Sequence, residues 1–187
     1  RDDTEVVVNL CIDFLKSRTD KKTVDLCSGS GAIAVALDKI SGAKVTAVEI
    51  DETAFSYLET NVKENNSSVK PVMADALEIC ETFADGELDL IVSNPPYIKS
   101  ADIETLQKEV RLEPRLALDG GEDGYDFYRE IVSRWSRKLK KGGALAFELG
   151  EGQADAVKAL MTDKGFSDFK ISLDFGGVQR AIIGTLL

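Results

Sequence analysis

Short apolar runs alternate with longer segments of helical period through the first half of the chain. Because the runs are mostly apolar and do not alternate strictly with polar residues, they are typical of strands buried on both faces of a sheet. The pattern predicts a βαβαβ arrangement, as in a doubly wound parallel sheet. The expected strands are residues 23–27, 44–50, 69–74 and 88–93, and the expected helices between them are residues 32–40 and 53–65.

The second half continues the sheet after a long irregular stretch. Residues 94 to about 124 are rich in charge and turn residues, and connections of that length are commonly functional. An opening helix over 4–16 is expected to pack on the sheet edge. Together the segments predict an α/β fold with a doubly wound, mostly parallel seven-stranded sheet and an antiparallel C-terminal strand. The later segments are a helix at 125–140, a strand at 142–149, a helix at 152–165, and strands at 169–175 and 179–187 joined by Gly176-Gly177.

The length of 187 residues and the mass of 20.3 kDa suit one core, so residues 1–187 are expected to form a single domain. The formal charge of -10 would repel a phosphate backbone, and no direct nucleic acid binding is expected. No stretch is apolar enough to cross a membrane, and the charged start "RDDTE" does not resemble a secretory leader. We therefore expect a cytoplasmic protein with no membrane partner.

The chain has three cysteines and no histidine, which excludes several kinds of site. Cys11, Cys27 and Cys80 are widely spaced, and without His the usual zinc ligand sets are missing, so no metal is expected. We expect reduced, mostly buried thiols. The absence of His also excludes Ser-His-Asp and Cys-His nucleophilic machinery, leaving carboxylates, amides, Lys, Tyr and backbone groups for chemistry.

The stretch "VDLCSGSGAIA" predicts a cofactor site between the first strand and the first helix. Gly29 and Gly31 allow a tight turn in which a ligand approaches backbone N–H groups at a helix N-terminus. The same stretch also fits a G-x-G-x-x-G/A dinucleotide fingerprint, so it does not identify the nucleotide. Glu49 ends the second strand, where a carboxylate can accept hydrogen bonds from both ribose hydroxyls.

Two further acids bear on the choice of cofactor. Asp25 precedes the glycine turn, where a carboxylate would disfavour a pyrophosphate but suit a cationic or zwitterionic group. Asp75 follows the third strand, where it could accept a hydrogen bond from an adenine amino group. With the loop and Glu49, these acids resemble the class I methyltransferases that bind S-adenosylmethionine. A dehydrogenase is disfavoured because the chain has no His and no Tyr-x-x-x-Lys pair.

The stretch "SNPPYI" follows the fourth strand, at the edge of the sheet where the cofactor is expected. Pro95 and Pro96 have fixed φ and no N–H, so the carbonyls of Asn94 and Pro95 are free of local donors and held in one direction. With the Asn94 side-chain oxygen they offer acceptors to a planar NH2 group, and Tyr97 supplies a face for stacking. The stretch therefore predicts a site that binds an amide or an exocyclic amine.

This tetrapeptide resembles the (N/D)-P-P-(Y/F/W) motif of amino-group methyltransferases, which include N6-adenine methyltransferases and glutamine-N5 methyltransferases of release factors. The stretch 111–131 is similar to the release-factor enzymes around Glu-Pro, Ala-Leu and Gly-Gly-x-Asp-Gly. The start resembles their Arg-Pro-x-Thr-Glu, with Asp2 in place of Pro. The residues that carry the resemblance are Glu113, Pro114, Ala117, Leu118, Gly120, Gly121, Asp123 and Gly124, with Arg1, Thr4, Glu5, Asp174, Gly177 and Arg180.

The resemblance implies methyl transfer from S-adenosylmethionine to the side-chain amide N5 of the glutamine in the Gly-Gly-Gln motif of a peptide chain release factor. The family also has a helical N-terminal recognition domain, to which nothing here corresponds, so we expect a catalytic domain cut or diverged from a longer form. The implied catalytic residues are Asn94, Pro95, Pro96 and Tyr97. Those implied for the substrate are Asn94, Pro95, Tyr97, Glu113 and Pro114. Those implied for the cofactor are Thr4, Glu5, Asp25, Cys27, Ser28, Gly29, Gly31, Ala32, Glu49, Ile50, Asp75, Ala76 and Asn94.

One departure from the family and two alternative functions remain. Cys27 replaces the usual first glycine of the cofactor loop and brings a side chain close to the amino-acid end of the cofactor. An N6-adenine methyltransferase of nucleic acid is disfavoured by the charge of -10 and by the lack of a basic stripe. A non-catalytic cofactor-binding scaffold is disfavoured by the intact "NPPY", since a scaffold has no need of the acceptor pair.

Overall fold

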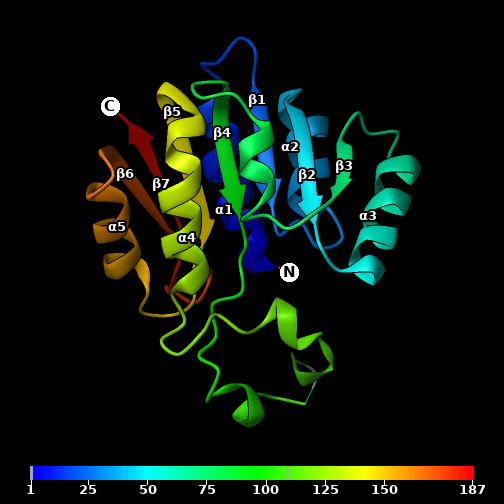
Figure 1. Ribbon diagram of the computed structural model, residues 1–187, viewed down its shortest axis with the longest axis vertical. Coiled ribbons are helices and arrows are strands. Elements are labelled where there is room, and N and C mark those ends of the chain that lie inside the picture. Colours follow the sequence, from blue (N-terminus) through cyan, green and yellow to red (C-terminus); the bar gives the residue numbers. More distant parts are fainter. Residues whose placement is uncertain (1, 109) are drawn as a thin grey trace.

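The computed structural model describes residues 2–108 and 110–187; Arg1 lies outside them, as do the side chains of Asp2 and Asp3. Seven strands form one sheet in the order β3-β2-β1-β4-β5-β7-β6 (Figure 1). Neighbours from β3 to β5 are parallel, whereas β7 is antiparallel to both β5 and β6. The predicted fold is therefore confirmed. The strands are β1 (Lys22–Leu26), β2 (Lys44–Glu49), β3 (Lys70–Met73), β4 (Leu88–Ser93), β5 (Leu139–Glu148), β6 (Phe166–Leu173) and β7 (Gln179–Leu186).

Helices cover both faces of the sheet (Figure 1). Side chains of β4 alternate between the faces, so Leu90 and Val92 join one core and Ile91 joins the other. All six residues of β4 are buried, which accounts for the consecutive apolar residues Leu90 to Val92. One face carries α1 (Asp2–Leu15), α2 (Ala32–Ser41) and α3 (Glu52–Glu64), and the other carries α4 (Asp126–Trp135) and α5 (Ala154–Thr162).

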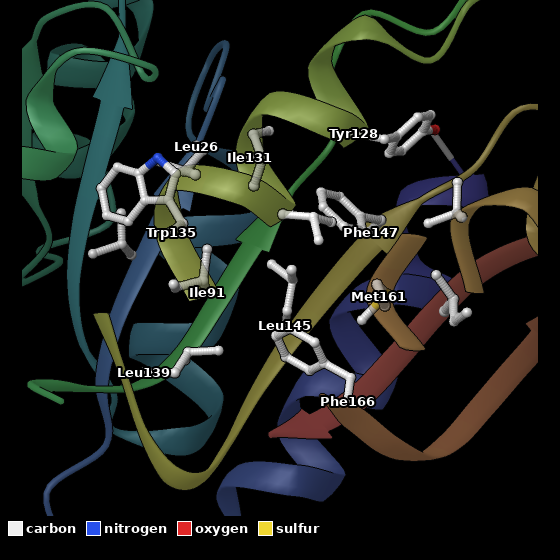
Figure 2. Packing of buried hydrophobic residues seen from close by; sticks show 14 of the residues in the cluster. Leu26, Ile91, Tyr128, Ile131, Trp135, Leu139, Leu145, Phe147, Met161 and Phe166 are labelled. Atoms are coloured by element: carbon white, nitrogen blue, oxygen red, sulfur yellow. The ribbon is translucent and has the colours of Figure 1, made fainter. Parts of the chain in front are cut away.

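The core under α4 and α5 contains the largest buried side chains. Figure 2 shows Trp135 and Tyr128 of α4 lying against the sheet beside Ile91 and Phe147. The rings of Tyr128 and Phe147 meet edge to face with centroids 5.1 Å apart. The Trp135 indole N–H donates to the Ala76 carbonyl at 2.9 Å, so the polar end of this buried side chain is satisfied. Packing of α4 thereby fixes the turn that follows β3.

One expectation about a helix is wrong. The helix expected over 125–140 ends at Trp135, a short 3-10 turn follows at Ser136–Lys138, and Leu139 already pairs with Leu88 in the sheet. Lys140 in the strand contacts Asp89, and Lys138 in the turn contacts Asp85, so tertiary pairing overrides the helical pattern. The first helix was expected at the sheet edge. It contacts the edge strand β6, but it also covers the interior strands β4, β5 and β7 with its apolar face.

The segment between β4 and α4 is irregular, as expected, with three short 3-10 turns at Ile103–Thr105, Val110–Leu112 and Arg115–Ala117. It extends beyond the end of the sheet at which β4 terminates (Figure 1). The three thiols are free; Cys11 and Cys80 are buried and Cys27 is half-buried. Among the described residues, no helix has the length and apolarity needed to span a membrane.

Candidate functional site

A cavity of about 300 Å³ lies at the carboxyl ends of the parallel strands. In a doubly wound sheet this end is where ligands bind. The turns after β1, β2 and β3 line it, together with the segment after β4. Ten of the predicted site residues line the cavity: Cys27, Gly29, Glu49, Ile50, Asp75, Ala76, Asn94, Pro96, Glu113 and Pro114.

The glycine loop turns sharply from β1 into α2. Cys27, Gly29 and Gly31 have φ of 56°, 54° and 83°, in the left-handed region that favours glycine. A Cβ at Gly31 would lie 2.3 Å from Cδ1 of Leu58 in α3, so a side chain there would displace Leu58 in addition to straining the φ of 83°. The Ser28 N–H donates to the Val48 carbonyl at 2.9 Å. The loop is therefore fixed against β2 and α3.

Glu49 holds the turns around it through its carboxylate. One oxygen accepts from the Gly29 N–H at 2.7 Å, and the other accepts from the N–H groups of Ile50 and Asp51 at 2.9 and 2.8 Å. The residue is 8% exposed and lines the cavity. A carboxylate has about four lone-pair sites, so it can still accept a hydrogen bond from a ligand hydroxyl.

Asp25 is fully buried one residue before the end of β1. No hydrogen bond reaches either carboxylate oxygen within the described residues. Burial raises the pKa of Asp25 to about 7; the Ser28 hydroxyl and the Ala34 N–H nearby lower it, and Glu49 raises it. A buried carboxylate without a partner is costly, and a positive charge nearby would relieve that cost. Asp25 does not itself line the cavity.

This set of acids fits S-adenosylmethionine better than a dinucleotide. An unpartnered buried carboxylate behind the glycine loop favours a sulfonium and an ammonium group and disfavours a pyrophosphate. Glu49 can accept from a ribose. Asp75, whose Oδ1 accepts from the Leu77 N–H at 2.7 Å, is fixed where an adenine ring would reach. The residues present therefore fit the group that the resemblance implies.

Asn94 leaves the sheet directly after β4 and lines the cavity with Pro96. The Ser93 hydroxyl donates to the Leu26 carbonyl at 2.8 Å, so the start of this stretch is tied to the end of β1. Within the described residues, the carbonyls of Asn94 and Pro95 accept no hydrogen bond. Both remain available to a donor from a bound ligand.

The other predicted residues lie beside the cavity rather than on it. Thr4 donates from its hydroxyl to Oε2 of Glu148 at 2.8 Å, and Glu5 is exposed on α1. Ser28 donates to the Asp25 carbonyl at 2.7 Å. Pro95 is buried and Tyr97 half-buried. Gly31 and Ala32 line a separate shallow groove between α2 and α3.

Cys27 brings a thiol to the cavity wall. Burial, followed by the charge of Glu49, raises the pKa of Cys27 to about 12. The thiol is therefore neutral at physiological pH and acts as a small apolar group. Its backbone has the left-handed φ expected for the glycine that it replaces.

Sequence reasoning missed several apolar residues of the cavity wall. Leu77 follows Asp75, Leu116 comes from the irregular segment, and Phe127 lies in the first turn of α4. Leu116 lies in a charged stretch without a regular period, and its exposure of 51% is known only from the structure. No sequence signal distinguishes Phe127, because its period fits an ordinary core helix.

Comparison with known proteins gives one family and several close relatives. Residues 3–113 match the family described as methyltransferase small domain. The chain is 41% identical to a release factor glutamine methyltransferase of Geobacter sulfurreducens, over 100% of this chain and 64% of that protein. It is 36% identical to the protein of that name from Clostridium acetobutylicum, over 98% of this chain and 65% of that protein. The chain therefore spans a little under two thirds of the length of these relatives.

Solved structures share the fold. A methyltransferase from Pyrococcus furiosus superposes with a TM-score of 0.69 at 24% identity, covering 92% of this chain and 79% of that one. At this identity the likeness concerns the architecture alone, and one fold serves many substrates.

Proposed function

The chain belongs to the methyltransferase small domain family, and from this premise we propose that it transfers a methyl group to the side-chain amide N5 of the Gly-Gly-Gln glutamine of a peptide chain release factor. The single observation that carries the proposal is Asn94, which lines the acid-lined cavity directly after β4 and whose carbonyl, like that of the adjacent Pro95, accepts no hydrogen bond within the described residues. The names of the relatives support the choice of acceptor. We further propose that residues 1–187 act as one catalytic domain.

The cofactor proposed is S-adenosylmethionine, which supplies the methyl group from its sulfonium when bound. Glu49 would accept from its ribose hydroxyls and Asp75 from its adenine amino group. Asp25 would contribute negative charge behind the loop at the methionine end. Two acids fixed by backbone N–H groups, the buried Glu49 and the half-buried Asp75, support this arrangement, because a preformed site loses little entropy on binding.

At the acceptor end, Asn94 and Pro95 would hold both N–H groups of the glutamine amide. An amide nitrogen is a poor nucleophile because its lone pair is delocalised. Two fixed acceptors would favour a less conjugated nitrogen and stabilise the positive charge that develops on it. Tyr97 would stack on the planar amide. Glu113 and Pro114, on the opposite wall, would contact the loop that bears the glutamine.

Charge supports a protein acceptor over nucleic acid. The cavity wall carries Glu49, Asp51, Asp75 and Glu113 but no Lys or Arg, and the whole chain has a formal charge of -10. Repulsion would act along the whole contact with a nucleic acid backbone. A Gly-Gly-Gln loop has little charge and no bulky neighbours, so it can enter a narrow site.

The test is methyl transfer to three acceptors: an intact release factor, DNA and tRNA. We expect a mass gain of one methyl on the Gly-Gly-Gln glutamine, and little on free glutamine, because binding energy from the rest of the release factor positions the amide. A release factor with that glutamine replaced by alanine is the matched control. Robust labelling of adenine with none on release factor would overturn the proposal.

A further inference from the structure

Tyr97 is enclosed by glycine backbone that leaves no room for side chains. A Cβ at Gly120 would lie 2.7 Å from Tyr97 Cα, and one at Gly124 would lie 2.6 Å from the Tyr97 carbonyl oxygen. A Cβ at Gly150 would lie 2.9 Å from Tyr97 Cδ2. The three glycines come from the end of the irregular segment and from the turn after β5. Together they form a close-fitting slot around the last residue of the Asn94-to-Tyr97 stretch.

The side chain of Gln153 joins the walls of this slot. It lies at the start of α5 and is 8% exposed. Its Nε2 donates to the Tyr97 and Gly124 carbonyls at 3.1 and 3.2 Å. Its Oε1 accepts from the Gly150 N–H at 2.9 Å. The Tyr128 hydroxyl lies 3.2 Å from the same oxygen. Its single proton can be donated either to this oxygen or to the Glu148 carbonyl.

Only a primary amide satisfies these partners. The carbonyls of Tyr97 and Gly124 can only accept, and the Gly150 N–H can only donate, so the orientation of the Gln153 amide is fixed. A carboxylate at this position would face two carbonyl oxygens with no proton to offer. A side chain without polar atoms would remove these hydrogen bonds from two buried backbone groups, the Gly124 carbonyl and the Gly150 N–H, and from the Tyr97 carbonyl, which is costly.

The anchor at Tyr97 matters because the stretch before it is stiff. Its other end is fixed by Ser93, through the sheet and through the hydrogen bond to the Leu26 carbonyl. Between the two anchors, Pro95 and Pro96 have fixed φ, so few torsions are free. Holding both ends therefore fixes the directions of the Asn94 and Pro95 carbonyls, and Asn94 lines the cavity.

We infer that Gln153 is a positioning residue for methyl transfer, which acts by holding the Tyr97 carbonyl and thereby the Asn94 and Pro95 acceptors. Gln153 does not line the cavity, so its effect passes through the backbone rather than through contact with a ligand. The inference rests on the proposed function for what those acceptors bind. The anchor itself can be tested without it.

Gln153→Met in the full chain keeps the length of the side chain and removes its donors and acceptor. We expect kcat for release factor methylation to fall about 10- to 100-fold, since a displacement of about 1 Å at the reacting groups has an effect of this size. The dissociation constant of S-adenosylmethionine should stay within about twofold, because no cofactor contact changes. The two quantities are measured by single-turnover kinetics and by calorimetry.

Two control variants separate positioning from loss of stability. Val157→Ala removes a fully buried side chain from α5 and leaves the Gln153 hydrogen bonds in place. Gln179→Met makes the same replacement at an exposed position. Both should keep kcat within about twofold at a temperature at which the variants are folded. Loss of kcat in Val157→Ala equal to that in Gln153→Met would overturn the inference.

Gln153→Glu adds a pH readout that a structural role alone would not give. Only the protonated acid can donate to the Tyr97 carbonyl, so its kcat relative to that of the parent chain should rise as the pH is lowered from 8 to 6. A ratio that does not change with pH would contradict the role of the donor.

Hydrogen exchange tests the anchor independently of activity. The N–H groups of Ile98, Ser100 and Gly120 donate to the Leu118, Gly121 and Ile98 carbonyls, which are bonds within the segment that Tyr97 begins. Their exchange should be at least about tenfold faster in Gln153→Met than in Val157→Ala. Equal rates would overturn the inference even if methyl transfer is confirmed. If the parent chain methylates no release factor, the proposed function fails, and faster exchange still establishes the anchor.

Discussion

The two walls of the cavity are held in different ways. Turns at the ends of β1, β2 and β3 form one wall, and their own side chains fix them: Glu49 accepts three backbone N–H groups and Asp75 accepts one. The segment from Asn94 to Gly124 forms the other wall and has only short 3-10 turns. It depends on a distant side chain, Gln153, and on close contact between glycines and Tyr97. The first wall is held by hydrogen bonds local to each strand end, and the second is held by contacts with residues that are distant in the sequence.

This difference predicts that the two walls serve different steps, one cofactor binding and the other methyl transfer. Changes in the strand-end wall should alter cofactor affinity and stability, because the same carboxylates shape the turns and face the cavity. Changes in the Asn94 wall should alter transfer and leave cofactor affinity unchanged. Each of the following variants tests one side of that division.

Asn94→Ala should have the largest effect. Removal of one positioned acceptor is expected to reduce the rate of methyl transfer by about 100- to 1,000-fold, equivalent to about 3–4 kcal/mol in the barrier. Cofactor affinity should be retained, and calorimetry with single-turnover kinetics separates the two. Asn65→Ala, at the exposed end of α3, is the matched control. Collapse of cofactor affinity with turnover of the bound complex intact would make Asn94 structural.

Glu49→Ala should weaken cofactor binding by about 1–3 kcal/mol, the typical effect of losing charge-assisted hydrogen bonds. The variant should also lower the melting temperature, because the N–H groups of Gly29, Ile50 and Asp51 lose their acceptor. Glu52→Ala, an exposed acid in the first turn of α3, is the control. Wild-type affinity in Glu49→Ala, or tight NADH binding by the parent chain, would contradict the cofactor assignment.

Asp25→Asn should stabilise the ligand-free protein at high pH. The pKa of Asp25 is raised to about 7, so between about pH 4 and 7 the native state holds more protons than the unfolded state. The contribution of Asp25 to the free energy of unfolding therefore falls as pH rises through this window. The variant should be more stable than the parent by up to about 4 kcal/mol at pH 8 and nearly equal to it at pH 4, since each unit of pKa corresponds to about 1.4 kcal/mol.

Urea unfolding at the two pH values measures the Asp25→Asn effect. The variant should also bind S-adenosylmethionine more weakly than the parent at pH 8, where the parent carboxylate is charged. A stability difference between variant and parent that does not grow from pH 4 to pH 8, or a variant that binds the cofactor more tightly, would refute the role of Asp25 as an unpaired acid.

Cys27→Gly should have the smallest effect. Removing the side chain relieves a left-handed φ of 56° and should stabilise the protein by about 1 kcal/mol, as measured by thermal unfolding. Asp168→Gly relieves a φ of 49° at an exposed position and should give a similar gain. Only Cys27→Gly opens the cavity, so only it should change cofactor affinity. Equal affinities in the two variants would show that the thiol does not restrict the site.

The strand-end wall was open to prediction from the sequence. Glu49 ends one apolar run and Asp75 follows another, and the carboxyl ends of parallel strands meet at one edge of a sheet. The first residue of the other wall, Asn94, could be placed in the same way because it directly follows β4. The expected strand 88–93 agrees with β4 at both ends. These positions follow from local pattern and topology, which is why they could be placed without coordinates.

The Asn94 wall was less open to prediction. Gln153 lies 56 residues from Tyr97 and 29 from Gly124, and "GQADAV" differs in no way from an ordinary helix start. The glycines at 120, 121 and 124 were noticed only through resemblance. Likewise, Leu139 was predicted to be helical but lies in β5, because it pairs with Leu88, a residue about 50 positions earlier in the chain. Contacts of this range have no signature in a local period.

The single tryptophan has a consequence for experiment. Trp135 is fully buried, and its indole is bonded to the carbonyl of Ala76, a residue of the cavity wall. Its ring centroid is 5.2 Å from that of Phe83. The chain therefore contains its own optical probe: with no label and no other indole to interfere, tryptophan emission reports on the backbone turn beside the proposed adenine position. Emission titrations can follow ligand occupancy and unfolding in the same sample.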